Sequence, residues 1–148
     1  LYVCKGLKCL PVLLGDLKNL KELQLHKCKE LTCLPPSLGQ LAQLTELRVV
    51  DCPLICELPF KEVKGETLSD LDSSIHYCIL PRLQLLEVAG IGISEVSFAE
   101  GVCFNLRDLT VSYCNNVEEL GTLPTTLVNL ALKLCDNLTK IDTICHLP

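Results

Sequence analysis

The sequence has no tryptophan and no methionine, and its three tyrosines and three phenylalanines make up only 4% of 148 residues. An aromatic-lined pocket for a small-molecule substrate is therefore not expected. The unbroken apolar runs are a few residues long, far short of the ~20 residues that a membrane-spanning helix needs. Composition thus predicts neither a membrane span nor a small-molecule site.

Clusters of basic residues are also missing, since 13 Lys and Arg stand against 18 Asp and Glu, a formal net charge of −5. Nucleic-acid binding needs basic patches that neutralise phosphates, so nucleic acid is disfavoured as a partner. The three histidines, His26, His76 and His146, are scattered, and none lies near a nucleophile in a recognisable arrangement. We therefore expect no enzyme activity and no cofactor, and a protein as the partner.

What the sequence does contain is a spaced apolar pattern that returns about every two dozen residues. The phrase LxxLxLxxC at Leu20–Cys28 comes back at Leu44–Cys52 with Val49 in place of the third leucine, and this interval is taken as the period. The phrase returns in whole or part from Leu83, Leu106 and Leu127. Its LxL triplet predicts a short strand with two leucines inward and one residue outward. The apolar residues that follow at intervals of three or four suit turns and short helical segments.

A single repeat of this kind cannot bury its own leucines, so neighbouring repeats must stack and share a core. We therefore predict an α/β leucine-rich-repeat solenoid, a curved horseshoe segment with a parallel β-sheet on its concave face and an irregular or short helical convex side. Leu1 and Cys4 lie one period before Leu25 and Cys28. Residues 1–148 are accordingly interpreted as one leucine-rich-repeat domain fragment of about six repeats, cut from a longer array.

One interval between repeats is much longer than the period, because the phrase that begins at Leu44 returns only at Leu83. The extra residues lie within 60–81, and their polar, acidic middle at 65–74 is expected to leave the core as a surface loop. Loops on rigid scaffolds often carry recognition, although a long polar loop can equally be idle. We also predict a break in the regularity of the solenoid near this insertion.

Eleven cysteines are present, and five of them recur at the turn that follows the strand: Cys4, Cys28, Cys52, Cys114 and Cys135. A thiol is a small apolar group with a weak donor, so cysteine suits such a turn. The fourth repeat has Ile91 there, which cannot donate, so we expect a looser turn. The cysteines are interpreted as reduced, mostly buried thiols of a cytoplasmic protein.

Two further patterns leave other chemistry open. Three cysteine pairs have spacings near those of zinc ligands, but the turn already uses one member of each, so no metal site is predicted. Asn137-Leu138-Thr139 is an acceptor sequon for N-glycosylation, which would suit an extracellular protein. The cysteine pairs with spacings near those of zinc ligands are Cys4/Cys9, Cys28/Cys33 and Cys52/Cys56.

The stretch Leu17–Pro59 reads LKNLKELQLHKCKELTCLPPSLGQLAQLTELRVVDCPLICELP, with Cys at the turn, a Leu-Pro step and a Leu-Gly-x-Leu segment. It resembles the leucine-rich repeats of plant nucleotide-binding leucine-rich-repeat (NLR) disease-resistance proteins, and the resemblance covers nearly the whole chain. It implies a sensor module of an intracellular immune receptor that binds a pathogen effector or a modified host protein, or holds the nucleotide-binding module inactive. No P-loop and no signalling domain is recognisable in these residues.

Two alternatives belong to other classes. Extracellular leucine-rich-repeat receptor ectodomains usually follow the turn with Gly-x-Ile-Pro, where this chain has Leu34-Pro35 and Leu58-Pro59. Cytosolic leucine-rich-repeat scaffolds and ubiquitin-ligase adaptors usually carry Asn where this chain has Cys. Both departures favour the immune-receptor interpretation.

The outward residues of successive strands should form columns on the concave face, and there we place the candidate protein-binding residues. Glu22, Glu46 and Asp108 fall in one column and suggest an acidic stripe that receives a basic patch, although an ordinary solvated surface gives the same pattern. The candidates are Glu22, Gln24, His26, Glu46, Arg48, Val50, Leu85, Glu87, Asp108, Thr110, Ser112, Asn129 and Lys133, with Ala89 and Ala131 in the same columns.

Overall fold

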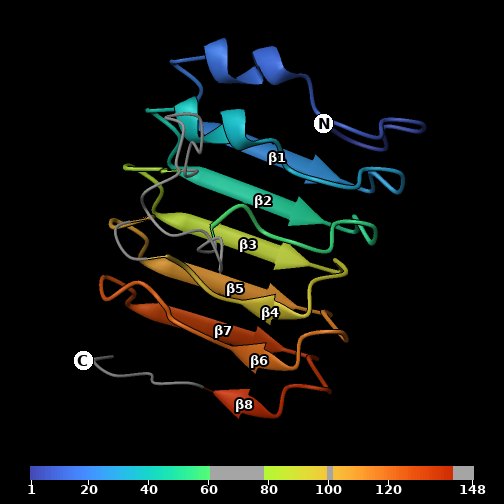
Figure 1. Cartoon of the computed structure of the whole chain (residues 1–148), viewed down its shortest axis with the longest axis vertical. Helices are drawn as coiled ribbons and strands as arrows, with labels where there is room; N and C mark the ends of the chain where they lie inside the picture. Colours follow the sequence, from blue (N-terminus) through green and yellow to red (C-terminus); the bar gives the residue numbers. More distant parts are fainter. Residues whose placement is uncertain (61–78, 100–101, 142–148) are drawn as a thin grey trace, which may run out of the picture.

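Five short parallel strands lie side by side and form the main sheet (Figure 1). The computed structural model describes residues 1–60, 79–99 and 102–141. The strand order, β1-β2-β3-β5-β7, follows the order of the repeats. The strands are β1 (Glu22–His26), β2 (Glu46–Val50), β3 (Leu85–Ala89), β5 (Asp108–Ser112) and β7 (Asn129–Lys133). The chain is a parallel-strand β-solenoid with few helices, which confirms the predicted fold class.

The strands pair without slippage, so equivalent residues of successive repeats lie beside one another. Leu23 pairs with Leu47, and Leu47 pairs with Leu86. Because side chains alternate along a strand, these leucines all point inward, and Leu47 and Leu86 are 0% exposed. Burying one leucine contributes about 1.5–3 kcal/mol, so the stacked column of leucines is a large part of what holds the repeats together.

The opposite side of the solenoid is less uniform. The first two repeats carry the 3₁₀ segments η1 (Val12–Asp16) and η2 (Pro36–Gln40). They agree with the predicted short helical segments on this side. Later repeats instead carry two-residue strands that form a second parallel sheet, in front of the main sheet in Figure 1: β4 (Glu95–Val96), β6 (Glu119–Leu120) and β8 (Lys140–Ile141). None of the described helices is long and apolar enough to cross a bilayer.

Each main-sheet strand is followed by a residue in the left-handed backbone conformation, which the sequence pattern did not predict. These residues, with φ between 51° and 60°, are Lys27, Asp51, Gly90, Tyr113 and Leu134, and Val3 has the same conformation one period before Lys27. The conformation costs a non-glycine residue roughly 1–2 kcal/mol. Backbone bonds to the next repeat offset this cost, as when Lys27 N donates to Val50 O at 2.9 Å.

The recurring cysteine closes the same turn. The Cys28 thiol donates to the carbonyl oxygen of His26 at 3.6 Å, and the Cys114 thiol donates to that of Ser112 at 3.2 Å. The weak-donor role predicted for these thiols is confirmed by this geometry. Cys28, Cys52 and Cys114 are buried, while Cys4 and Cys135 are partly exposed.

The looser turn expected at Ile91 is found. After Cys28, Cys52, Cys114 and Cys135 the N–H three residues further on donates to the cysteine carbonyl oxygen, as Leu31 N does to Cys28 O at 3.2 Å, and the described residues after Ile91 form no such bond. The strand end before it is regular. Gly90 has the same left-handed φ, +60°, and its N–H donates to Ser112 O at 2.9 Å, as the equivalent residue does in the other repeats. Ile91 is 4% exposed and packs in the core. Glycine adopts this φ without strain, so the end of the strand keeps the regular conformation, and the difference lies in the turn after Ile91.

The predicted break near the insertion is wrong for the main sheet. Strands β2 and β3 pair directly, with Glu46 opposite Leu85, although the insertion lies between them in sequence. On the opposite side, the described residues before the insertion contain the two 3₁₀ segments and the Cys9–Cys33 bridge, and those after it contain the three two-residue strands. The predicted loop at 65–74 lies outside the described residues, but both borders are anchored: Phe60 and Leu80 are 0% exposed, and Phe60 stacks on Phe98 at 5.4 Å.

The buried thiols predict a loss of stability at alkaline pH. Burial raises the pKa of the Cys52 thiol and of the Cys114 thiol above the ordinary value of 9.0. The folded chain therefore keeps both protonated where the unfolded chain ionises them. Their contribution to stability is fully present below about pH 9 and is lost as the pH rises.

Urea unfolding at several pH values between about 8 and 10 checks this expectation. The free energy of unfolding should fall more steeply with pH in the unaltered chain than in the double variant Cys52→Ala/Cys114→Ala. The exposed-thiol variant Cys9→Ala/Cys33→Ala is the matched control and should keep the steep fall. Equal slopes in all three proteins would contradict the expectation.

Candidate functional site

The outward face of the main sheet is formed by alternate residues of its five strands. The register confirms the columns predicted from the repeat, with Glu22 beside Glu46 and Gln24 beside Arg48. The first column is Glu22, Glu46, Leu85, Asp108, Asn129, the second is Gln24, Arg48, Glu87, Thr110, Ala131, and the third is His26, Val50, Ala89, Ser112, Lys133.

Exposure along the third column is uneven. Ser112, which was predicted to contact a protein partner, is buried. Ser112 is 6% exposed and its neighbour Ala89 7%. They pair with each other between Val50 and Lys133, and both are shorter than the side chains that flank them. Ser112 therefore lies on this face without offering surface to a partner, which corrects its place among the candidate residues.

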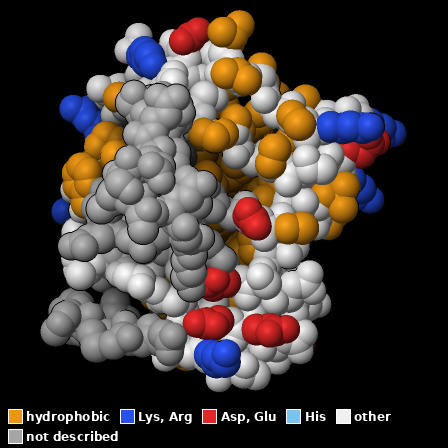
Figure 2. Space-filling model, in the orientation of Figure 1, with side chains coloured by type: hydrophobic (Ala, Val, Ile, Leu, Met, Phe, Trp, Pro, Cys, Tyr) orange, Lys and Arg blue, Asp and Glu red, His pale blue; other side chains and the backbone are white. Residues whose placement is uncertain are grey.

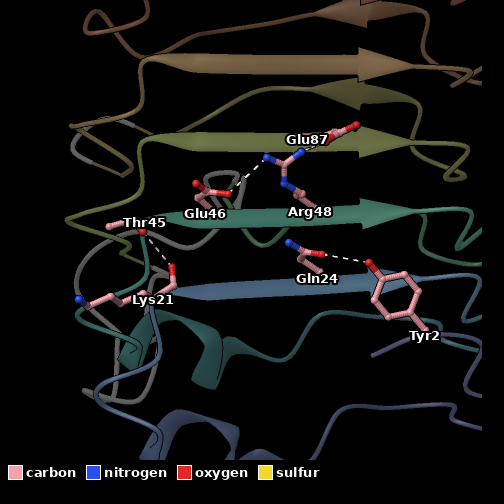
Figure 3. Close-up of polar contacts among 7 residues, drawn as sticks. All are labelled: Tyr2, Lys21, Gln24, Thr45, Glu46, Arg48 and Glu87. Carbon is pink, nitrogen blue, oxygen red and sulfur yellow. Dashed lines mark hydrogen bonds and ion pairs between the residues drawn. The ribbon is translucent and has the colours of Figure 1, made fainter.

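Arg48 of β2 makes two ion pairs on the outward face, one with Glu87 of the neighbouring strand β3 and one with Glu46 of its own strand (Figure 3). One guanidinium nitrogen lies 2.7 Å from Glu87 Oε2, and the other lies 3.3 Å from Glu46 Oε2. Desolvation lowers the pKa of Arg48, but the hydrogen bonds and charges of Glu46 and Glu87 outweigh it and raise the pKa above its ordinary value. Arg48 is thus permanently charged and held across β2 and β3.

These pairs change the predicted acidic stripe. Glu46 is partly neutralised by Arg48, and Leu85 separates it from Asp108 in the column. Asp108 Oδ1 accepts a hydrogen bond from Asn129 Nδ2 at 2.6 Å. Two of the three carboxylates of the first column, Glu46 and Asp108, are therefore partnered, and Leu85 interrupts the column between them.

An aromatic pair extends the outward face beyond β1. Tyr2 stacks on His26 with ring centroids 4.6 Å apart, and its hydroxyl donates to Gln24 Oε1 at 3.3 Å (Figure 3). Tyr2 is bridged to His26 in parallel register. Sequence reasoning missed Tyr2 as a site residue, although its position one period before His26 was the available signal.

Two polar atoms of this face are buried without a hydrogen-bond partner among the described residues. They are His26 Nε2 and Arg48 Nε. A buried unpaired polar atom costs about 1–3 kcal/mol, so these two side chains are held on the face at some cost in stability. His26, which the sequence places among the outward candidate residues, is half-buried and stacked on Tyr2.

Other chemistry finds little support in the described residues. No group of three or more Cys, His, Asp or Glu there is placed to hold a metal ion. The cysteine pairs with zinc-like spacing are split, since Cys28 and Cys52 are buried while Cys33 and Cys56 are exposed. His76 and His146 lie outside the described residues.

The side of the second sheet has a different character. Figure 2 shows hydrophobic side chains gathered over the N-terminal repeats and acidic ones around β4 and β6. An open hollow of about 390 Å³ lies there, lined by Thr32, Cys33, Leu34, Leu54, Cys56, Glu57, Leu58 and Pro59. Two exposed cysteines thus border one apolar hollow.

Comparison with known proteins gives a likeness among solved structures. No protein-family model and no curated protein matches the sequence. Among solved structures, the chain is similar to the leucine-rich-repeat domain of the type III effector XopL, with 21% identity and a TM-score of 0.43, over 91% of this chain and 60% of that one. The repeat and sheet described above define the class on their own, a leucine-rich-repeat type of β-solenoid. The matched structure does not bear on a plant receptor origin.

The Arg48 cluster predicts a small, salt-dependent contribution to stability. Its three side chains are about one-third exposed, so solvent screens the pairs and Arg48→Gln should lower the free energy of unfolding by up to about 1 kcal/mol. Lys140→Gln is the control, because that ion pair to Glu119 spans 3.8 Å and Lys140 is 70% exposed. Urea unfolding at low and high salt measures both, and a loss at Arg48 that persists in high salt would rule out the electrostatic explanation.

Proposed function

We propose that this chain is a protein-recognition module and that its binding surface is the outward face of the main sheet. The observation that carries the proposal is the in-register array of outward side chains on five parallel strands. Strands about 4.8 Å apart hold these side chains at fixed spacing. A partner therefore meets a preformed surface, which lowers the entropy cost of association.

The chemistry of the face indicates a partner with a basic patch. Carboxylates outnumber cations there, with Glu22, Glu46, Glu87 and Asp108 against Arg48 and Lys133. Complementary charge sets specificity and association rate. The exposed Tyr2 ring, fixed on His26, supplies the kind of aromatic anchor on which binding energy concentrates.

More specifically, we propose that this recognition module is the sensor region of a plant intracellular immune receptor and is not an enzyme. It would act in the cytoplasm, binding a pathogen effector or modified host protein, or another domain of the same receptor. Activation would be conformational, because a ligand that binds one state better shifts the population toward that state. The buried cysteine turns and Leu-Pro steps that carry the resemblance support this interpretation.

One contact favours this proposal over an extracellular ectodomain. Asn137 Nδ2 donates to the carbonyl oxygen of Asn115 at 2.6 Å, so it forms part of the contact between two repeats. N-glycosylation would place a bulky sugar on that nitrogen. Coding sequence flanking this segment separates the classes: a nucleotide-binding P-loop supports the proposal, whereas a signal peptide or an F-box supports an alternative.

Charge reversal on the face tests the binding proposal. Immobilised chain is used to capture proteins from plant cell extract, and the triple variant Glu22→Lys/Glu46→Lys/Asp108→Lys should lose those that the unaltered chain retains. The control Glu30→Lys/Glu57→Lys/Glu118→Lys makes the same charge change at exposed positions outside the columns and should retain them. Circular dichroism confirms that each variant is folded, and identical captures by all three proteins would refute the proposal.

A further inference from the structure

We propose that Cys9 and Cys33 are a thiol pair that a small-molecule disulfide oxidises to a disulfide bond between two adjacent repeats. Nothing in the binding proposal requires this pair, which lies on the side of the second sheet. It is a modification site defined by backbone register, side-chain direction and exposure together.

Backbone register places the two cysteines beside each other. Cys9 and Cys33 are partners in an isolated parallel β-bridge. Next to it, Thr32 N donates to Lys8 O at 3.0 Å, and the Thr32 hydroxyl donates to the same oxygen at 3.2 Å. Paired strands lie about 4.8 Å apart, within the ~4.4–6.8 Å between Cα atoms that a disulfide spans.

Side-chain direction places both thiols on the same, solvent side. The following residues, Leu10 and Leu34, are 4% and 6% exposed and point into the core. Because side chains alternate in extended backbone, Cys9 and Cys33 point outward together, and both are exposed. An oxidant can therefore reach both sulfur atoms, unlike those of the buried turn cysteines.

The competing partner for Cys33 is Cys56, which borders the same apolar hollow. Cys56 is also exposed, but it stands out of register: it follows Cys52 by four positions, whereas Cys33 follows Cys28 by five. Its thiol donates to the carbonyl oxygen of Leu54 at 3.4 Å. Register thus selects Cys9 as the partner of Cys33.

The reaction is thiol–disulfide exchange and needs no further reagent. The thiolate of one cysteine attacks the small disulfide, forms a mixed disulfide and expels one thiolate. The second cysteine attacks the protein-bound sulfur, forms the Cys9–Cys33 bond and expels the other. Two protein thiols are oxidised, the small disulfide is reduced to two thiols, and the two cysteine protons pass to the leaving sulfurs.

The bond would lock one repeat onto the next. In a solenoid each repeat contacts only its neighbours, so the separation of adjacent repeats is a local event that one covalent bond restrains. The loop that the bond closes, from Cys9 to Cys33, is one full period of the repeat. Oxidation should therefore raise the temperature at which these two repeats unfold.

The test treats the folded chain with oxidised glutathione, blocks remaining thiols with iodoacetamide, and maps tryptic peptides by mass. Cleavage after lysine and arginine leaves Cys9 alone in peptide 9–18 and Cys33 alone in peptide 30–48. The expected product is these two peptides joined with the loss of two hydrogens, in both the unaltered chain and Cys56→Ser. Cys33→Ser should instead carry glutathione on Cys9 and show no rise in thermal midpoint on oxidation.

Three results would overturn the proposal. These are glutathione on both Cys9 and Cys33 without a joined peptide, a Cys33–Cys56 link as the main product in the unaltered chain, or unmodified Cys9 and Cys33 after treatment that oxidises the same cysteines in urea-unfolded chain. Circular dichroism before oxidation confirms that each variant is folded, so each result concerns the native arrangement.

Discussion

In-register stacking of parallel strands is the constraint on which the rest of this molecule depends. Each repeat offers two inward leucines or valines from its strand, and one repeat alone leaves them exposed to water. Stacking turns them into continuous columns in which Leu47, Leu86 and Val88 are 0% exposed. A left-handed residue ends each strand, and at three of the turns a buried thiol follows it, as Cys28 follows Lys27; there the chain turns away from the strand.

The same register creates both surfaces of functional interest. On the outward face it lines up side chains from five repeats, sets Arg48 between Glu46 and Glu87, and puts Tyr2 on His26. On the opposite side it sets Cys9 beside Cys33. The binding face and the thiol pair thus both follow from the regular length of the repeat, which places equivalent residues side by side. Neither depends on an irregular loop to position its residues.

The sequence was sufficient for features that depend on the period alone. Strand positions, columns and the turn cysteines follow from the regular spacing and from alternation of side chains. It was not sufficient where side-chain size or reach decides: Ser112 is covered because it is short, and Arg48 pairs because it spans two strands. The looser turn at Ile91, by contrast, follows from the sequence, because the repeat that lacks the turn cysteine also lacks the hydrogen bond that closes the other turns. The main sheet continues across the insertion because the added residues leave the strands unchanged.

Two neighbouring residues of β3 test the inward and outward assignment most directly. Leu86 is 0% exposed and belongs to the stacked core, whereas Leu85 lies on the outward face. Urea unfolding of Leu86→Ala and Leu85→Ala compares the same chemical change at both positions. Stacking predicts a loss of about 2–5 kcal/mol for Leu86→Ala and below about 1 kcal/mol for Leu85→Ala. Equal losses, or a larger loss at Leu85, would contradict the register on which the core, the binding face and the thiol pair all rest.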